Sequence, residues 1–215
     1  MKITKHVDIV RCDTIRNSRL VLYHNFESQG TQVDMSEVNL AIFHELGLEA
    51  EEVAGKTHAA TCECFWCGGR INIKQNLQWR CLRCKEKGNS SSLLSKMYQS
   101  FLDDTPAAKI NKLAKNRGVT TTSLTNYGIA WNPINESYVL PAYNLDNSLS
   151  NLYRYFLKSD HPDYALAGKV LSASGKKPWP FRILSLPKKP VTVWLCEGPW
   201  DAMRLEECLK ESLYK

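Results

Sequence analysis

Four cysteines arranged in two Cys-x-x-Cys pairs are the residues whose types and spacing most clearly point to chemistry. Cys64 and Cys67 form the first pair, Cys81 and Cys84 form the second, and thirteen residues separate them. Each pair can turn two thiolates toward one ion, and a hairpin in the intervening stretch would bring both pairs around a tetrahedral Zn²⁺. A Gly-Gly step directly after the first pair supplies a tight turn. The spacing therefore predicts a structural zinc site.

The chain has eight cysteines in all, many for a protein kept under reducing conditions, and metal binding explains four of them better than disulfides do. Two residues close to the first pair, His58 and Cys62, stay open as substitute ligands. The cysteines outside the two pairs are scattered along the chain, so we expect them to be buried or free thiols without a shared role: Cys12, Cys62, Cys196 and Cys208.

Cations and aromatic side chains surround the cysteine pairs. Phosphate attraction and base stacking are then both available, which favours single-stranded nucleic acid as a partner. The alternative is that Trp79 packs over the ribbon while the cations only solvate its outside. The predicted nucleic-acid-binding residues are Trp66, Arg70, Lys74, Trp79, Arg80, Arg83 and Lys85. Phe65 and Lys87 are a further aromatic residue and a further cation of the same segment.

The composition allows a globular protein and excludes a disordered one. With 215 residues, 43% of them apolar, the chain can bury one core or two small ones. The formal net charge of +6 suits a polyanionic partner without requiring one. No run approaches the roughly 18 apolar residues that a membrane-spanning helix needs, so we expect a cytoplasmic protein without a membrane partner.

Periodicity and punctuation divide the chain into four predicted regions. These are an N-terminal α/β region of unknown role (1–55), the zinc ribbon (56–92), a helical spacer (93–132) and a C-terminal region (133–215). The first should hold strands near 7–10 and 20–23 and a helix from Asp34 or Ser36 to Gly47. The ribbon should end in a polar turn or linker at 87–92.

The two C-terminal regions carry clearer signals. Thr105 as cap, Pro106 as first residue and Gly118 as stop predict one helix, and a shorter helix should follow at 121–127. Strands 137–141 and 152–156 should pair as a hairpin. A buried parallel strand at 191–196 should then lead into a helix, and that helix should bury Ala202, Leu205, Cys208 and Leu209.

Three segments in this order resemble the DNA primase family, found as bacterial replicative primases and phage primase-helicases. The first is the ribbon. The second is Ser137-Tyr138-Val139-Leu140-Pro141-Ala142-Tyr143 through Leu152-Tyr153-Arg154, followed by Lys169-Val170-Leu171-Ser172-Ala173-Ser174-Gly175. The third is Leu195-Cys196-Glu197-Gly198-Pro199-Trp200-Asp201-Ala202, which is similar to the first motif of the TOPRIM catalytic core. The resemblance implies an α+β protein with a zinc ribbon, a helical spacer, a β-hairpin region and the first β-α unit of a TOPRIM core.

The resemblance also implies a function and its residues. The chain would bind single-stranded DNA template and contribute to RNA primer synthesis from ribonucleoside triphosphates, in the host cytoplasm if a phage encodes it. Glu197 would hold Mg²⁺ or Mn²⁺ or act in acid-base catalysis, supported by Asp201. Arg154 and Lys169 would face the nucleotide or the template. The alternatives are an ordinary helix N-terminal acid for Asp201 and surface cations for the other two.

The sequence departs from the family in one respect that bears on catalysis. TOPRIM cores use a later strand with an Asp-x-Asp pair, whereas this sequence has only eighteen residues after Glu197 and no such pair there. It also has no Gly-x-x-x-x-Gly-Lys-Ser/Thr phosphate loop of a helicase. We therefore expect either a partial core, completed by a second polypeptide or working with a replicative helicase, or a non-catalytic nucleic-acid-binding adaptor of a replication complex. A TOPRIM nuclease or topoisomerase relative fits less well, because the ribbon precedes the core.

Overall fold

The computed structural model describes residues 40–53, 58–144, 146–172 and 196–213. The strands predicted near 7–10 and 20–23 and most of the one at 191–196 lie outside these residues. Among the described helices, none combines the length and apolar character that crossing a bilayer requires.

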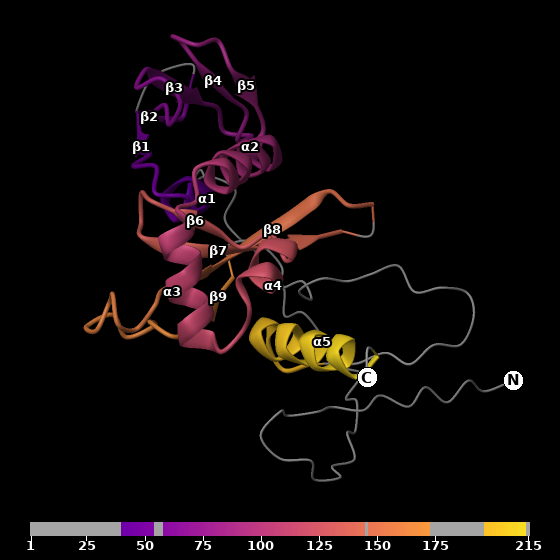
Figure 1. The fold of residues 1–215 in the computed structure, drawn as a ribbon. Coiled ribbons are helices and arrows are strands. Elements are labelled where there is room, and N and C mark those ends of the chain that lie inside the picture. Colours follow the sequence, from indigo (N-terminus) through magenta and orange to yellow (C-terminus); the bar gives the residue numbers. More distant parts are fainter. Residues whose placement is uncertain (1–39, 54–57, 145, 173–195, 214–215) are drawn as a thin grey trace, which may run out of the picture.

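Two small antiparallel sheets organise the protein (Figure 1). The first has the order β1-β2-β3-β4-β5 and consists of β1 (Glu51–Glu52), β2 (Ala60–Glu63), β3 (Arg70–Ile73), β4 (Trp79–Cys81) and β5 (Lys87–Gly88). The second has the order β6-β7-β8-β9 and consists of β6 (Ala130–Asn132), β7 (Ser137–Tyr143), β8 (Leu149–Tyr155) and β9 (Val170–Leu171). The mixed α+β class and the β7-β8 hairpin agree with the sequence prediction. Every strand pair of the described residues is antiparallel.

The helices connect and cover the sheets. Helix α1 (Ala41–Glu45) precedes the first sheet, and α2 (Ser90–Asp103) joins it to the rest of the chain. Helices α3 (Ala107–Arg117) and α4 (Thr121–Asn126) confirm the two predicted helices of the spacer. Pro106 lies one position earlier than predicted, as the residue before the helix, and Gly118 ends α3 in the left-handed conformation at φ +62°.

Helix α2 corrects one sequence prediction. Residues 90–92, expected in a turn or linker, are its first turn. The Asn89 side chain accepts a hydrogen bond from the Ser92 backbone N–H, and the Ser92 hydroxyl oxygen accepts one from the Asn89 N–H. Asn and Ser serve helix caps as readily as turns, so the polar run alone could not distinguish them. The helix then buries an apolar stripe: Leu93, Leu94, Met97, Tyr98 and Phe101.

The second sheet is buried on both faces and separates two apolar clusters. Val139 and Leu152 lie in one cluster with α1, α2 and the first sheet. Tyr138, Leu140 and Tyr155 alternate with them along the strands and lie in the other cluster, with α3, α4 and α5 (Pro199–Leu213). Figure 1 shows the resulting layers, with α2 and the first sheet on one side of the second sheet and α5 on the other.

Helix α5 buries a different stripe from the predicted one. Trp200 and Met203 face the core. Of the four residues predicted to be buried, Ala202 and Leu205 are half-buried, Cys208 is exposed and Leu209 is 38% exposed. The rings of Trp200 and Tyr155 pack edge to face, with their centroids 5.1 Å apart. Contacts with the second sheet therefore set the rotation of α5 about its axis, and the spacing of apolar residues in its sequence does not.

Polar contacts fix α5 against the ends of two other helices. The Arg204 side chain donates hydrogen bonds to the backbone carbonyl of Arg117 at the end of α3. The Glu207 carboxylate accepts hydrogen bonds from the backbone N–H and the hydroxyl of Thr120, which caps α4. Both contacts satisfy backbone groups that helix termini leave without a partner.

Truncating Met203 and Leu209 tests whether α5 buries the stripe seen in the structure or the stripe predicted from the sequence. Met203→Ala should lower the free energy of unfolding by about 2–5 kcal/mol, because it opens a cavity at a fully buried position. Leu209→Ala, the control, should cost under about 1 kcal/mol, because its side chain is already partly in water. Urea denaturation of both variants measures the difference. Equal costs would show that α5 does not pack in the orientation described.

Candidate metal centre

The two cysteine pairs fold into knuckles of the same geometry. In the first, the Cys64 N–H donates to the Gly69 carbonyl at 2.6 Å, and in the second the Cys81 N–H donates to the Glu86 carbonyl at 2.8 Å. The residue before each acceptor is left-handed, with φ +63° at Gly68 and φ +65° at Lys85. Both turns therefore span six residues and are closed by the same backbone hydrogen bond.

The four sulfur atoms converge on one point in space. The Sγ atoms of Cys64 and Cys84 are 3.9 Å apart, those of Cys67 and Cys81 are 3.5 Å apart, and the ligand atoms of all four residues lie within 4.8 Å of one another. A tetrahedral ion with metal–sulfur bonds of about 2.3 Å requires sulfurs about 3.8 Å apart. The predicted ligand set could thus hold a metal ion, and its geometry is consistent with structural zinc.

The thiol pKa values of Cys64, Cys81 and Cys84 are not shifted in the same direction, and Cys81 of the second knuckle is the one that is favoured as a thiolate. Burial raises the pKa of the Cys64 thiol to about 12. Burial also acts to raise the pKa of Cys81, but hydrogen bonds from the backbone N–H groups of Cys84 and Arg83 outweigh it and lower that pKa to about 6. Thiolates are the metal-binding form, so these backbone donors favour binding.

Arg83 fastens the two knuckles to each other. Its Nη1 donates to the Cys67 carbonyl at 2.8 Å. Gly69 allows this approach, because a Cβ at that position would lie 2.5 Å from the Arg83 Cβ. Lys85 likewise donates from Nζ to the Leu82 carbonyl at 2.6 Å. These two predicted nucleic-acid contacts therefore also serve the metal centre.

The two substitute ligands that the sequence left open lie apart from the sulfur cluster. Cys62 is buried in β2 opposite Ile71. The Nε2 atom of His58 is buried and has no hydrogen-bond partner among the described residues. The four cysteines are the single group of three or more metal-binding side chains that the described residues bring together.

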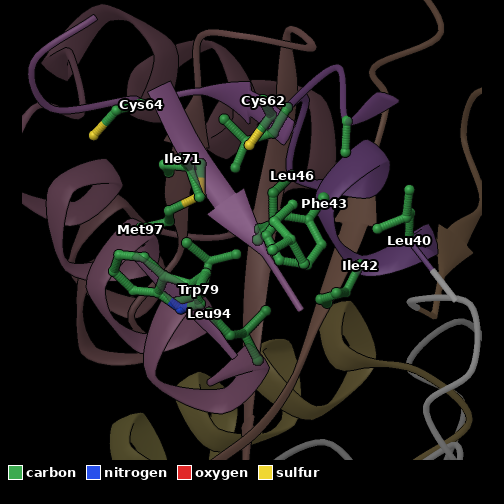
Figure 2. Close-up of a cluster of buried hydrophobic side chains, with 14 of the residues drawn as sticks. Leu40, Ile42, Phe43, Leu46, Cys62, Cys64, Ile71, Trp79, Leu94 and Met97 are labelled. Atoms are coloured by element: carbon green, nitrogen blue, oxygen red, sulfur yellow. The ribbon is translucent and has the colours of Figure 1, made fainter. Parts of the chain in front are cut away.

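The aromatic residues of the ribbon pack inward. Trp79 is 2% exposed, and its Nε1 donates to the Asn89 carbonyl at 2.9 Å. Figure 2 shows its ring beside Leu94 and Met97 of α2. Trp66 stacks on Trp79 with ring centroids 5.8 Å apart, and its Nε1 donates to the Ser100 hydroxyl. This burial matches the alternative of packing over the ribbon, and it leaves Trp79 without a face for base stacking.

All five predicted nucleic-acid-binding cations and their neighbour Lys87 lie at the surface, unlike the tryptophans. Arg80 lies opposite Lys87 on β5, and Asn72 of β3 lies opposite Arg80. Residues opposite each other in an antiparallel sheet share a face, so this face is the one turned away from Ile71, Ile73 and Trp79. The exposed cations of the ribbon are Arg70, Lys74, Arg80, Arg83, Lys85 and Lys87.

Arg154 is placed differently from its prediction as a residue facing nucleotide or template. Its Nη2 lies 3.3 Å from Glu45 Oε1 of α1, with the two side chains 20% and 10% exposed. The register of β8 sets this outcome, because Arg154 pairs with Val139 and so faces α1 on the ribbon side of the second sheet. Nothing in the sequence around either residue signals an ion pair between partners so far apart in the chain.

The other predicted catalytic residues do not gather around Arg154. Lys169 is exposed just before β9. Glu197 is exposed and Asp201 is half-buried in the first turn of α5, which packs on the opposite face of the second sheet. The described residues therefore show two carboxylates at a helix start rather than an assembled Mg²⁺ site.

Comparisons with known proteins add no relative to this description. No protein-family model matches the chain, and no curated protein matches it. The functional argument therefore rests on the cysteine cluster and on the charges around it.

Proposed function

We propose that this chain is a zinc-binding protein of primase type whose ribbon, residues 58–88, binds single-stranded DNA. One observation carries the proposal: a sheet whose cysteines could share a metal ion presents a row of exposed cations on its outer face. A metal-stapled sheet with a basic outer face can present fixed charges to a polyanion.

Zinc is the ion that the donor set favours. Four thiolates are soft ligands, and tetrahedral sulfur coordination is typical of Zn²⁺ or iron. With all four positions filled by cysteine, a bound zinc would have no open position for water and would supply folding energy rather than chemistry. The short strands of this sheet, none longer than four residues, fit such a role.

Phosphate attraction would supply most of the affinity. Arg70, Lys74, Arg80 and Lys87 are exposed, and none of them has an ion-pair partner among the described residues. Leu82, 48% exposed beside them at the tip of the second knuckle, offers an apolar contact for a base. A preference for single strands and a role in priming follow from the resemblance to primases.

The adaptor function is a second candidate, and the position of Arg154 favours it. A residue expected at the nucleotide is an internal ion-pair partner instead. If the chain does take part in catalysis, Glu197 and Asp201 would hold Mg²⁺ or Mn²⁺ at the start of α5. Two carboxylates bind such ions weakly without further acids and substrate phosphates.

Zinc should be present at one ion per chain. Cys67→Ser combined with Cys84→Ser should abolish stoichiometric zinc, whereas Cys62→Ser, the matched control, should retain it, because Cys62 lies outside the cluster. Metal analysis by mass spectrometry measures both. Chelation should expose the amides of β3, β4 and α2 to hydrogen exchange while α3 and α5 stay protected, because only the first group shares a core with the cysteines. Stoichiometric zinc in the double variant would refute the assignment.

Binding to single-stranded DNA should depend on salt through the ribbon cations. Replacing Arg80 and Lys87 with Gln should reduce the slope of log K against log salt by about 1.4, since each single-strand phosphate contact contributes about 0.7. Fluorescence anisotropy with an oligo-dT measures the slope. Gln at Lys115 and Lys158, exposed cations outside the ribbon, removes the same charge as a control and should leave the slope unchanged. Equal effects of both pairs would show that only net charge matters.

A primer-synthesis assay distinguishes the two candidates. On single-stranded template with ribonucleoside triphosphates and Mg²⁺, this chain alone should make little or no primer. A polypeptide that supplies an Asp-bearing TOPRIM strand should restore synthesis, and Glu197→Gln should then abolish it while DNA binding and zinc content stay unchanged. Failure of every such complementation would favour the adaptor. Robust synthesis that survives Glu197→Gln would place the active site elsewhere.

A further inference from the structure

The outer face of the first sheet is divided into an acidic and a basic part. Strand register places one residue of each strand in a row across this face. Glu51 of β1 pairs with Thr61, Thr61 with Asn72, Asn72 with Arg80, and Arg80 with Lys87 of β5. The row therefore begins with a carboxylate at the β1 edge and ends with two cations at the β5 edge.

A second cross-strand pair shows the same polarity. Glu63 of β2 lies directly opposite Arg70 of β3 and is exposed, yet the described residues show no ion pair between them. Glu86, next to β5, is the acid on the basic side, and its carboxylate is paired with Lys96 of α2. The open carboxylates of the face thus lie on β1 and β2, and its open cations lie on β3, β4 and β5.

We infer that the polynucleotide strand lies over β3, β4 and β5 and is kept off β1 and β2 by Glu51 and Glu63. This inference rests on the proposed function and adds the path of the ligand. Arg70 and Lys74 are four residues apart in an extended segment, about 13 Å, and three strands span about 10 Å. This basic patch has room for a short stretch of single strand, and it runs from the β3–β4 turn to the second knuckle.

The ranges of the charges decide how each acid acts. Glu63 is one strand, about 5 Å, from Arg70, which is within the Debye length of about 8 Å at physiological ionic strength. Glu51 is two strands from β3, about 10 Å, where salt already screens most of its field. Glu63 should therefore repel a phosphate at β3 strongly, and Glu51 should matter mainly at low salt.

Removing the acids one at a time tests the path. With the full chain and a fluorescent oligo-dT at about 50 mM salt, Glu63→Gln should raise affinity about two- to fivefold. Glu51→Gln should raise it less, and both gains should shrink at about 300 mM. Asp163→Asn, an exposed acid outside the sheet, removes the same charge as a control and should change affinity little. Equal gains in all three variants would overturn the inference.

Photocrosslinking gives a readout that does not depend on charge. A benzoylphenylalanine at Gln78, exposed at the basic end of the hairpin, should crosslink to oligo-dT, whereas one at Glu51, exposed on β1 in the row of the outer face, should not. Crosslinking from position 51 alone, or equally from both positions, would overturn the path even if the DNA is bound. Absence of DNA binding by the unmodified chain, or insensitivity to Arg80→Gln and Lys87→Gln, would instead overturn the proposed function itself.

Discussion

The convergence of four sulfur atoms is the constraint on which the ribbon depends. Its strands are two to four residues long, too short to hold a sheet together by backbone hydrogen bonds alone. The two knuckles tie β2 to β3 and β4 to β5, and the sulfurs tie the knuckles to each other. Without a cation, charged thiolates at this distance repel one another, whereas a shared metal ion would link the two knuckles.

The cysteine cluster is continuous with a larger apolar core. Cys64 and Cys81 are buried in the same apolar cluster as α2 and one face of the second sheet. Trp66 and Trp79 join the ribbon to α2 by ring stacking and by hydrogen bonds from their indole N–H groups. The aromatic rings are therefore used inside the protein, and the outer face of the ribbon is left to charged side chains. The ribbon therefore shares an apolar core with α2 and the second sheet.

The burial of the second sheet explains why Arg154, predicted to face nucleotide or template, forms an internal ion pair. Both of its faces are covered, so each side chain on β7 and β8 must find a partner in an apolar cluster or pair its charge. Arg154 does the latter with Glu45, which also draws α1 onto the sheet. Breaking such a half-buried pair leaves a charge without compensation, which gives the residue a structural reason to be there.

Local spacing in the sequence determined the cysteine ligand set, the helix at 107–117 with its glycine stop, and the hairpin of β7 and β8. These features depend on neighbours within a few turns of chain, and side-chain chemistry alone specifies them. Only the tertiary structure decided which way Trp79 points, that Arg154 meets Glu45, and which stripe α5 buries through Trp200 and Met203. Those outcomes depend on surfaces brought together from distant parts of the chain, where the register of a strand or the rotation of a helix selects the partner.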